Sequence, residues 1–308
     1  MMQILVLSPR VAPGILTLAA WDALRAATVV RAAEDGPHVR AVIASGVAVE
    51  VTPGTPSLDP GTVWIAPVGD AAWARAVADD LMGGSASDEE SVEVVFGSYD
   101  LPGSALLDVV EVMDRLRREC PWTSRQTHAS LSRYLLEEAH ETLEALDSGD
   151  GEHLREELGD LLMQIVFHAR IAAEESAEEG GGWDIDDVAA GITAKLIRRS
   201  PHVFADGAAS TPEEVDAAWQ RLKASEKQRS SPLEGVPATL PALAYADKII
   251  GRLGDVDVSG DDLGSRLLAL VAEARAQDRD AEETLRQAVR RLVQDPRARR
   301  VGVQAPRD

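Results

Sequence analysis

Residues 135–165 decide the fold of this chain, because they form two helical segments around one short turn. The first segment reads LLEEAHETLEAL over 135–146, and the second reads LREELGDLLMQI over 154–165. Between them stand Ser148-Gly149-Asp150-Gly151, residue types that end one helix and begin the next. The sequence therefore predicts an antiparallel pair of helices in the middle of the chain.

Four acidic residues of this helix pair are expected to converge. At 100° per residue, Glu138 and Glu141 lie about 60° apart on the first helix, as do Glu157 and Asp160 on the second. Each pair lies within an apolar stripe, the kind of face that packs against another helix. Glu138 is level with Asp160, and Glu141 with Glu157, because both pairings are symmetric about Gly149. The four carboxylates should meet roughly 12–17 Å from the turn.

Such a cluster needs compensation for its charge. Carboxylates about 5 Å apart repel one another by on the order of 3 kcal/mol per pair at an effective dielectric constant near 20. Either protons or a cation must offset this repulsion. Oxygen-only ligands favour a hard ion, so we expect Mg²⁺ first and Mn²⁺ second.

A di-iron carboxylate bundle is a competing interpretation of the same residues. It requires Glu-x-x-His on two helices. Glu137 and His140 have this spacing, but both point away from the acidic face. The second helix also offers Asp160 where a histidine would be needed.

The remaining segments predict a mostly α chain in which a helical bundle follows a small α/β region. Strands are expected at 4–7, 39–51, 62–66 and 92–96, and helices at 15–33 and 70–82, before a polar stretch at 83–90. Further helices are expected at 106–118, 127–147, 152–177, 184–199 and 211–228, with two or three weaker ones in 240–294. Residues 229–237 are interpreted as a linker, and the last dozen residues as loose. The predicted domains are 1–100, 101–237 and 238–308.

Composition narrows the class of protein. The chain has 308 residues, 45% of them apolar, which is enough for a sizeable core. Its 52 acidic residues against 31 basic ones give a net charge of −21, which argues against non-specific nucleic-acid binding or docking on an anionic membrane. The one cysteine, Cys120, excludes an intramolecular disulfide, and no apolar run approaches the roughly 20 residues of a membrane span. The apolar N-terminal stretch is too short for a signal peptide, so we expect a cytoplasmic protein.

The central motifs resemble a known family. CPWTSRQTHASLSRYLLEEAHETLEAL (120–146), followed by LREELGDLLMQIVFHARIA (154–172), resembles the MazG family of nucleoside triphosphate pyrophosphohydrolases. That family carries EExxE and then ExxD, which correspond here to Glu137-Glu138-x-x-Glu141 and Glu157-x-x-Asp160. KLIRRSPHVF (195–204) and AAWQRLKASEK (217–227) also look like MazG. The resemblance covers about 101–250.

The resemblance implies roles for particular side chains. Its catalytic metal ligands are the four carboxylates that the helix geometry also selects, Glu138, Glu141, Glu157 and Asp160. Its phosphate contacts would be Lys195, Arg199 and Lys223, and its base-stacking residue would be Trp219. Arg198 is a further candidate for the phosphates, and Trp122 and Gln126 are candidates for structural or pocket-lining residues.

Two positions depart from the family pattern. Thr123 stands where the usual motif CPWD has aspartate, and Ser200 replaces the first histidine of a His-Pro-His sequence. Neither position is a presumed metal ligand, so we expect effects on packing or substrate preference.

Both ends of the chain resemble degenerate modules. Some family members carry two tandem copies, and EELGDLLMQIVFHAR (156–170) aligns with DDLGSRLLALVAEAR (261–275), in which Ser265 stands in place of Asp160. We interpret 240–294 as a degenerate second copy without its own metal, kept for packing or dimerisation; with the loose tail it makes up the predicted domain 238–308. Residues 4–30 resemble the opening of tetrapyrrole methylases, but their first turn, 8–13, lacks the glycines that admit a cofactor. We expect a structural remnant there and no S-adenosylmethionine site.

The resemblance implies magnesium-dependent hydrolysis of nucleoside triphosphates to monophosphate and pyrophosphate, in a homodimer that sanitises nucleotide pools. Water would attack the α-phosphorus, with a ligand glutamate or Glu137 as the base. One alternative is a catalytically drifted protein that binds nucleotides or regulates. Another is an enzyme restricted to one modified or deoxy nucleotide.

Overall fold

The computed structural model describes residues 1–67, 69–83, 91–175, 181–226, 231–254, 256–258 and 260–294. The chain divides into two compact units, Met1–Thr193 and Ala194–Asp308. Five sequence predictions fall wholly or partly outside the described residues: the polar stretch 83–90, the ends of the helices at 152–177 and 211–228, the start of the linker at 229 and the loose tail. The predicted boundaries at 100/101 and 237/238 remain predictions.

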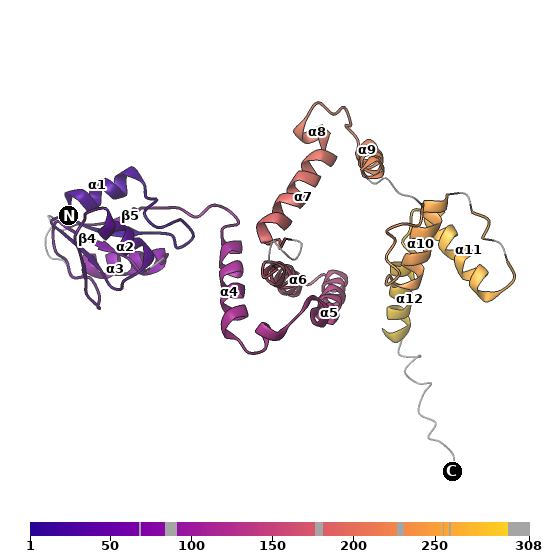
Figure 1. Cartoon of the computed structure of the whole chain (residues 1–308), viewed down its shortest axis with the longest axis horizontal. Helices are drawn as coiled ribbons and strands as arrows, with labels where there is room; N and C mark the ends of the chain where they lie inside the picture. The colour runs from indigo at the N-terminus through magenta and orange to yellow at the C-terminus, as the bar shows by residue number, and fades with distance from the viewer. Residues whose placement is uncertain are drawn as a thin grey trace, which may run out of the picture. The chain divides into compact units, whose positions relative to one another are not determined.

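The first unit begins with a parallel sheet (Figure 1). Its strands have the order β3-β2-β4-β1-β5, and every pairing is parallel. The strand bounds are β1 (Met2–Val6), β2 (Val29–Ala32), β3 (Val49–Val51), β4 (Thr62–Ile65) and β5 (Val92–Phe96). The helices of this region are α1 (Leu18–Ala26), α2 (Pro37–Ala44) and α3 (Ala71–Gly83).

The sheet is buried on both faces, as a parallel sheet requires. Along β1 successive side chains alternate between the two cores. Leu5 and the following Leu7 pack in one cluster, whereas Ile4 and Val6 pack in the other. This alternation explains why residues 4–7 are all apolar. Gln3, earlier in β1, instead donates from its side-chain amide to Glu93 of β5.

Two sequence predictions in this region are wrong. The helix expected at 15–33 ends at Ala26, because Ala27 is extended and Val29–Ala32 pair with two neighbouring strands. The strand expected at 39–51 begins as helix α2, with Gly36 as N-cap and Pro37 in its first turn. Pairing with neighbouring strands overrides the alanine- and leucine-rich, helix-favouring composition of 15–33. The start signal at Pro37 overrides the β-branched composition of 39–51.

The rest of the first unit is helical. Its elements are α4 (Ala105–Glu119), the 3₁₀ turn η1 (Thr123–Arg125), α5 (His128–Ser148), α6 (Gly151–Ala172) and most of α7 (Ile185–Arg199). Their core gathers Met113, Leu131, Val166 and Phe167. Arg10 forms ion pairs with Asp100 and Asp108, which link the loop after β1 to the start of α4.

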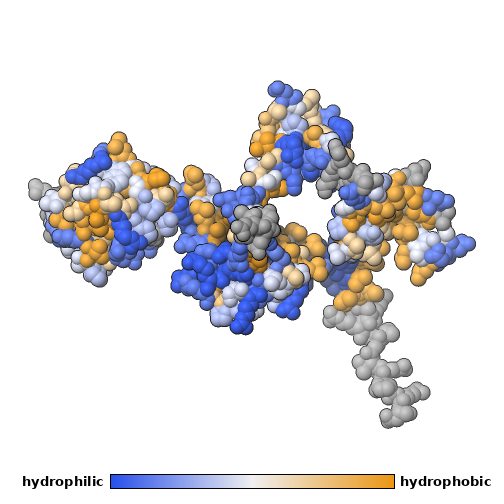
Figure 2. Space-filling model, in the orientation of Figure 1, coloured by the Kyte–Doolittle hydropathy of each residue, from blue (hydrophilic) through white to orange (hydrophobic). Residues whose placement is uncertain are grey.

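The second unit contains helices after the end of α7. Their bounds are α8 (Pro201–Phe204), α9 (Pro212–Ser225), α10 (Ala242–Leu253), α11 (Leu263–Ala276) and α12 (Ala281–Gln294). Figure 2 shows apolar side chains gathered where α10 and α11 lie, and Leu267 and Leu270 are exposed there. The fold-class prediction, a mostly helical chain preceded by a small α/β region, is confirmed. None of the helices in the described ranges is both long and apolar enough to cross a membrane.

Candidate active site

The hairpin of α5 and α6 is fixed at its ends by side-chain caps. Thr127 begins α5 with a capping box, in which its hydroxyl accepts from the Ser130 amide and the Ser130 hydroxyl accepts from the Thr127 amide. Gly149 ends α5 with a φ of 72°, a left-handed conformation that glycine adopts without strain. Asp150 then begins α6, and its carboxylate accepts the amide of Glu152 at 2.9 Å. Gly149 and Asp150 thus form the short turn that joins the two helices.

Three carboxylates meet across this hairpin. Glu138 on α5 and Glu157 and Asp160 on α6 each bring one oxygen within 4.8 Å of the others. Glu157 is 8% exposed, and the other two are half-buried. The sequence prediction that these residues converge therefore agrees with the geometry, and their role as metal ligands stays a prediction.

Glu141 lies beside this group of three, on the exposed side of α5. It follows Glu138 by three positions, a spacing that brings side chains together on a helix. Burial raises the pKa of Glu138, and the charges of Asp160, Glu141 and Glu157 raise it further. The site thus already disfavours ionised Glu138, as expected where negative charge gathers without compensation.

The residues present are suited to a hard cation. One Glu157 oxygen is paired with His153 Nε2 at 3.1 Å, while the other, Oε2, is buried without a hydrogen-bond partner among the described residues. A buried carboxylate oxygen without a partner is costly, and a bound cation would satisfy it. The donor set of the three carboxylates is oxygen only, which suits Mg²⁺. The acidic cluster could therefore bind a metal ion.

Two neighbours of the cluster were not selected from the sequence. His153 precedes Glu157 by one helical turn, and Gln164 follows Asp160 by one turn. Gln164 is 3% exposed, and its Oε1 is buried without a partner among the described residues. The i, i+4 spacing could have suggested both residues, but polar residues at that spacing are common on helices.

The predicted phosphate and base contacts belong to α7 and α9. Lys195 is exposed on α7, in the second unit. Arg199 is buried and donates from Nε to both oxygens of Glu226, at 3.2 Å each. Its guanidinium also lies over the Trp219 ring, 5.4 Å from the ring centre. The structure thus brings Arg199 and Trp219 together.

Glu226 was not singled out from the sequence. Arg199, and then Arg198, hold its pKa at about 2. Arg198 donates to Glu226 Oε1 at 2.8 Å, so both arginines engage the same carboxylate. Lys223 is half-buried and lines a hollow between α9, α10 and α11. The nucleotide-binding roles of these residues stay predictions.

The departure at Thr123 has a packing explanation. Its hydroxyl donates to the carbonyl oxygens of Leu116 and Cys120, so Thr123 fastens η1 to the end of α4. Trp122 is 51% exposed and meets Tyr134 edge to face, with 6.0 Å between ring centres. Gln126 donates to the Trp122 carbonyl. These contacts agree with the structural role expected of Trp122 and Gln126.

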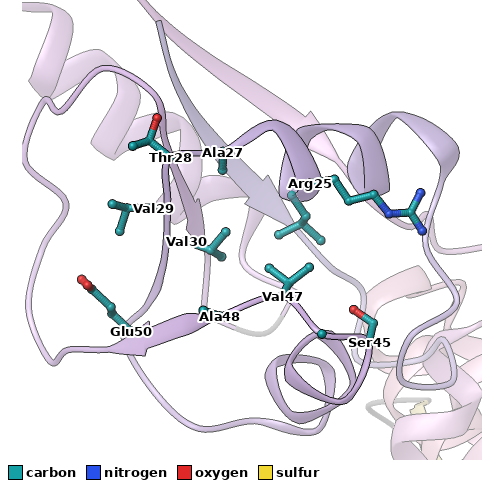
Figure 3. Close-up of a pocket in the computed structure, with 11 residues that line it drawn as sticks. Arg25, Ala27, Thr28, Val29, Val30, Ser45, Val47, Ala48 and Glu50 are labelled. Atoms are coloured by element: carbon teal, nitrogen blue, oxygen red, sulfur yellow. The ribbon is translucent and has the colours of Figure 1, made fainter.

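A second hollow, of about 410 Å³, lies in the N-terminal sheet region. Val29, Val30 and Val47 line it, with Arg25 and Glu50 on opposite sides (Figure 3). It is at the amino ends of β2 and β3, whereas ligands of open α/β sheets bind at the carboxyl ends. At the carboxyl end of β1, His38 Nε2 instead contacts the Ser8 carbonyl oxygen at 2.9 Å. The interpretation of this region as a structural remnant stays a prediction.

Comparisons with known proteins agree with the motifs. Residues 126–204 match the MazG nucleotide pyrophosphohydrolase domain. The chain is 47% identical over 215 residues to an uncharacterized 26.1 kDa protein of Streptomyces cacaoi, covering 68% of this chain and 88% of that protein. It is 41% identical over 209 residues to a nucleoside triphosphate pyrophosphohydrolase of Mycolicibacterium smegmatis, covering 67% of this chain and 62% of that protein.

A third relative shows which family the chain belongs to. The nucleoside triphosphate pyrophosphohydrolase/pyrophosphatase MazG of Thermotoga maritima is 34% identical over 218 residues, which cover 61% of this chain and 82% of that protein. The helical hairpin and its cluster of carboxylates are the features expected of a nucleotide pyrophosphohydrolase of helical fold. The aligned relatives then identify the family. The chain belongs to the MazG family of nucleotide pyrophosphohydrolases.

Proposed function

We propose that this protein hydrolyses nucleoside triphosphates to monophosphate and pyrophosphate in a magnesium-dependent reaction at the α5–α6 hairpin. The observation that carries this function is the meeting of Glu138, Glu157 and Asp160 within 4.8 Å. Family membership, together with the activity named for two of its relatives, supports the same reaction.

The carboxylates are the residues that would hold the ion. Glu138, Glu157 and Asp160 supply oxygen ligands, and Glu141 stands next to Glu138 to complete the predicted set of four. When bound there, Mg²⁺ would supply positive charge that offsets the negative charge of the phosphate oxygens and polarises the reacting phosphorus. His153, which contacts Glu157 at 3.1 Å, is a positioning residue for that carboxylate.

The remaining roles concern the substrate. Water attacks the α-phosphorus and gives its proton to a base, which is a ligand glutamate or Glu137. Pyrophosphate leaves as the bond between the α-phosphorus and the α–β bridging oxygen breaks. Lys195, Arg199 and Lys223 stabilise the charge that develops on the leaving group. Trp219 offers a flat aromatic surface for the base, and Arg199 already packs over that ring. Arg199 must share its guanidinium between Glu226 and any phosphate.

A homodimer is part of this proposal. The described part of the hairpin exposes several large apolar side chains, including Leu136 at 60%, Leu146 at 55% and Leu158 at 51%. Exposed apolar surface of this kind marks an interface, and closed two-fold pairing is the commonest solution. The cellular role that the family implies is removal of unwanted nucleotides from the pool.

The test is pyrophosphate release from a panel of NTPs and dNTPs, with Mg²⁺ and with EDTA, for the wild type and Glu138→Ala. Magnesium-dependent release that the variant loses supports the proposed reaction and its site. Release of orthophosphate would overturn the position of cleavage. Nucleotide binding without turnover across the panel would favour the alternative of a binding or regulatory protein, and turnover of a single nucleotide would favour the narrower enzyme.

A further inference from the structure

The second unit contains a hollow with an unusual charge for this chain. It has a volume of about 320 Å³ and lies between α9, α10 and α11. Its lining includes one carboxylate, Asp247, and four cationic side chains, which are Lys223, Lys248, Arg252 and Arg275. In a chain whose net charge is −21, this is a local concentration of positive charge.

Hydrogen bonds hold the two arginines of the hollow, Arg275 and Arg252, in place. Arg275 donates from Nη1 to Asp247 Oδ1 at 3.0 Å, and this ion pair joins α11 to α10. Gly251 makes the approach possible, since a Cβ added there would lie 2.6 Å from Arg275 Cζ. Arg252 donates to the carbonyl oxygens of Pro232 and Glu234, which fixes its guanidinium at the edge.

The two lysines differ from the arginines. Within the described residues, neither Lys223 nor Lys248 forms an ion pair. Lys223 is half-buried on α9, and Lys248 is exposed on α10. Asp247 pairs with Arg275, so the residues that line the hollow include four cations and one carboxylate, which is already paired. Converging ammonium and guanidinium groups suit an anion that carries several oxygens.

We infer that this hollow binds the polyphosphate group of a nucleotide or of free pyrophosphate. The ligand must carry several charges, because single charges are weakly held at an exposed site. Lys248 and Arg275 come from the segment interpreted as a degenerate second copy of the module. That segment has Ser265 where the first copy has Asp160, so it lacks one of the acidic residues. It nevertheless supplies cations to the hollow that Lys223 also lines. The degenerate copy is thus an anion-binding element rather than only a packing element.

The inference rests on the proposed function for the identity of the anion, so its first test excludes turnover. Isothermal titration calorimetry of the full-length protein in EDTA uses pyrophosphate and orthophosphate as probes. The acidic cluster carries only negative charge under these conditions, so it does not contribute an anion site. Pyrophosphate is expected to bind the wild type more tightly than orthophosphate does.

The matched variants are Lys248→Ala and Arg266→Ala. Both remove one exposed cation, but Arg266 on α11 does not line the hollow. Lys248→Ala is expected to weaken pyrophosphate binding about tenfold, the loss of one charge-assisted contact, and Arg266→Ala less than about twofold. Gly251→Ala displaces the Arg275 guanidinium and should weaken binding while all cations remain.

Two results would overturn the inference. One is the lack of any pyrophosphate binding to the folded wild type in EDTA, and the other is an equal loss in Lys248→Ala and Arg266→Ala. Steady-state kinetics then distinguish the two sources of the polyphosphate. A raised KM with unchanged kcat in Lys248→Ala assigns the hollow to the substrate, whereas unchanged KM with weaker pyrophosphate inhibition assigns it to the product. If the protein proves to have no hydrolase activity, the calorimetry still decides whether the anion site exists.

Discussion

Removal of one carboxylate from the acidic cluster should make the metal-free protein more stable. Glu138→Gln keeps the shape of the side chain and removes its charge, next to Glu157 and Asp160. Without a cation, each of these charges repels the others, and burial already raises the pKa of Glu138. The variant therefore loses repulsion while its packing is preserved.

The size of the effect follows from the separations. Two charges 4.8 Å apart repel by about 3.5 kcal/mol at an effective dielectric constant of 20 and by about 0.9 kcal/mol at that of water. Glu138 and Asp160 are half-buried, so the value lies between these limits. Because Glu138 takes part in two pairs and proton uptake relieves some of the repulsion, we expect a gain of about 2 kcal/mol in the free energy of unfolding.

Urea unfolding in EDTA and in MgCl₂ measures this gain. In EDTA, Glu138→Gln should unfold at higher urea than the wild type. Magnesium at a hundredfold excess over its Kd should stabilise the wild type by about 2.7 kcal/mol and the variant much less. Glu144→Gln on the exposed side of the same helix is the matched control and should leave both values unchanged. A variant that is less stable than the wild type in EDTA, and that still responds fully to Mg²⁺, would refute the reasoning.

Three further substitutions test the packing and the ion pairs. Glu226→Gln should lower the free energy of unfolding at pH 7, because it removes the ion pair with Arg199. That pair holds the pKa of Glu226 at about 2, below its ordinary 4.5. Its stabilisation is therefore present above pH 4.5 and is lost as the pH falls toward 2. The urea midpoint of Glu226→Gln should therefore approach that of the wild type at pH 3. A difference between the two midpoints that is the same at pH 7 and pH 3 would argue against the ion pair. Leu131→Ala, in the core of the α4–α6 bundle, should cost about 2–5 kcal/mol by urea unfolding, and a loss below about 1 kcal/mol would show that the core is not packed as described. Gly97→Ala places a Cβ 2.4 Å from Leu7 Cδ2, and thermal unfolding should show a loss of about 1–3 kcal/mol; an unchanged transition would contradict that close approach.

The acidic site was predictable because it depends on local geometry. Helical periodicity places Glu138 and Asp160 on facing stripes, and Gly149 fixes the turn about which they are level. The structure brings Glu138, Glu157 and Asp160 together in this way. Glu141, also expected in the cluster, is exposed and is not one of the three residues whose oxygens lie within 4.8 Å of one another.

The remaining features depend on contacts between residues far apart in sequence. Arg199 has the spacing of a phosphate contact, but nothing local shows that Glu226, 27 positions later, engages it. The strand at Val29–Ala32 forms because it pairs with β3 and β4, which no local preference reveals. The cationic hollow likewise combines side chains of three helices, and Gly251 acts only through its closeness to Arg275.

The most direct test of the central claim compares two isosteric variants of the hairpin, Glu157→Gln and Glu144→Gln, by their rates of NTP hydrolysis in Mg²⁺. Nucleoside monophosphate and pyrophosphate are quantified separately in each reaction. We predict equal amounts of both products for the wild type and Glu144→Gln, and a loss of at least about a hundredfold in rate for Glu157→Gln. Wild-type rates in a folded Glu157→Gln protein would contradict the assignment of the reaction to the carboxylates of α5 and α6.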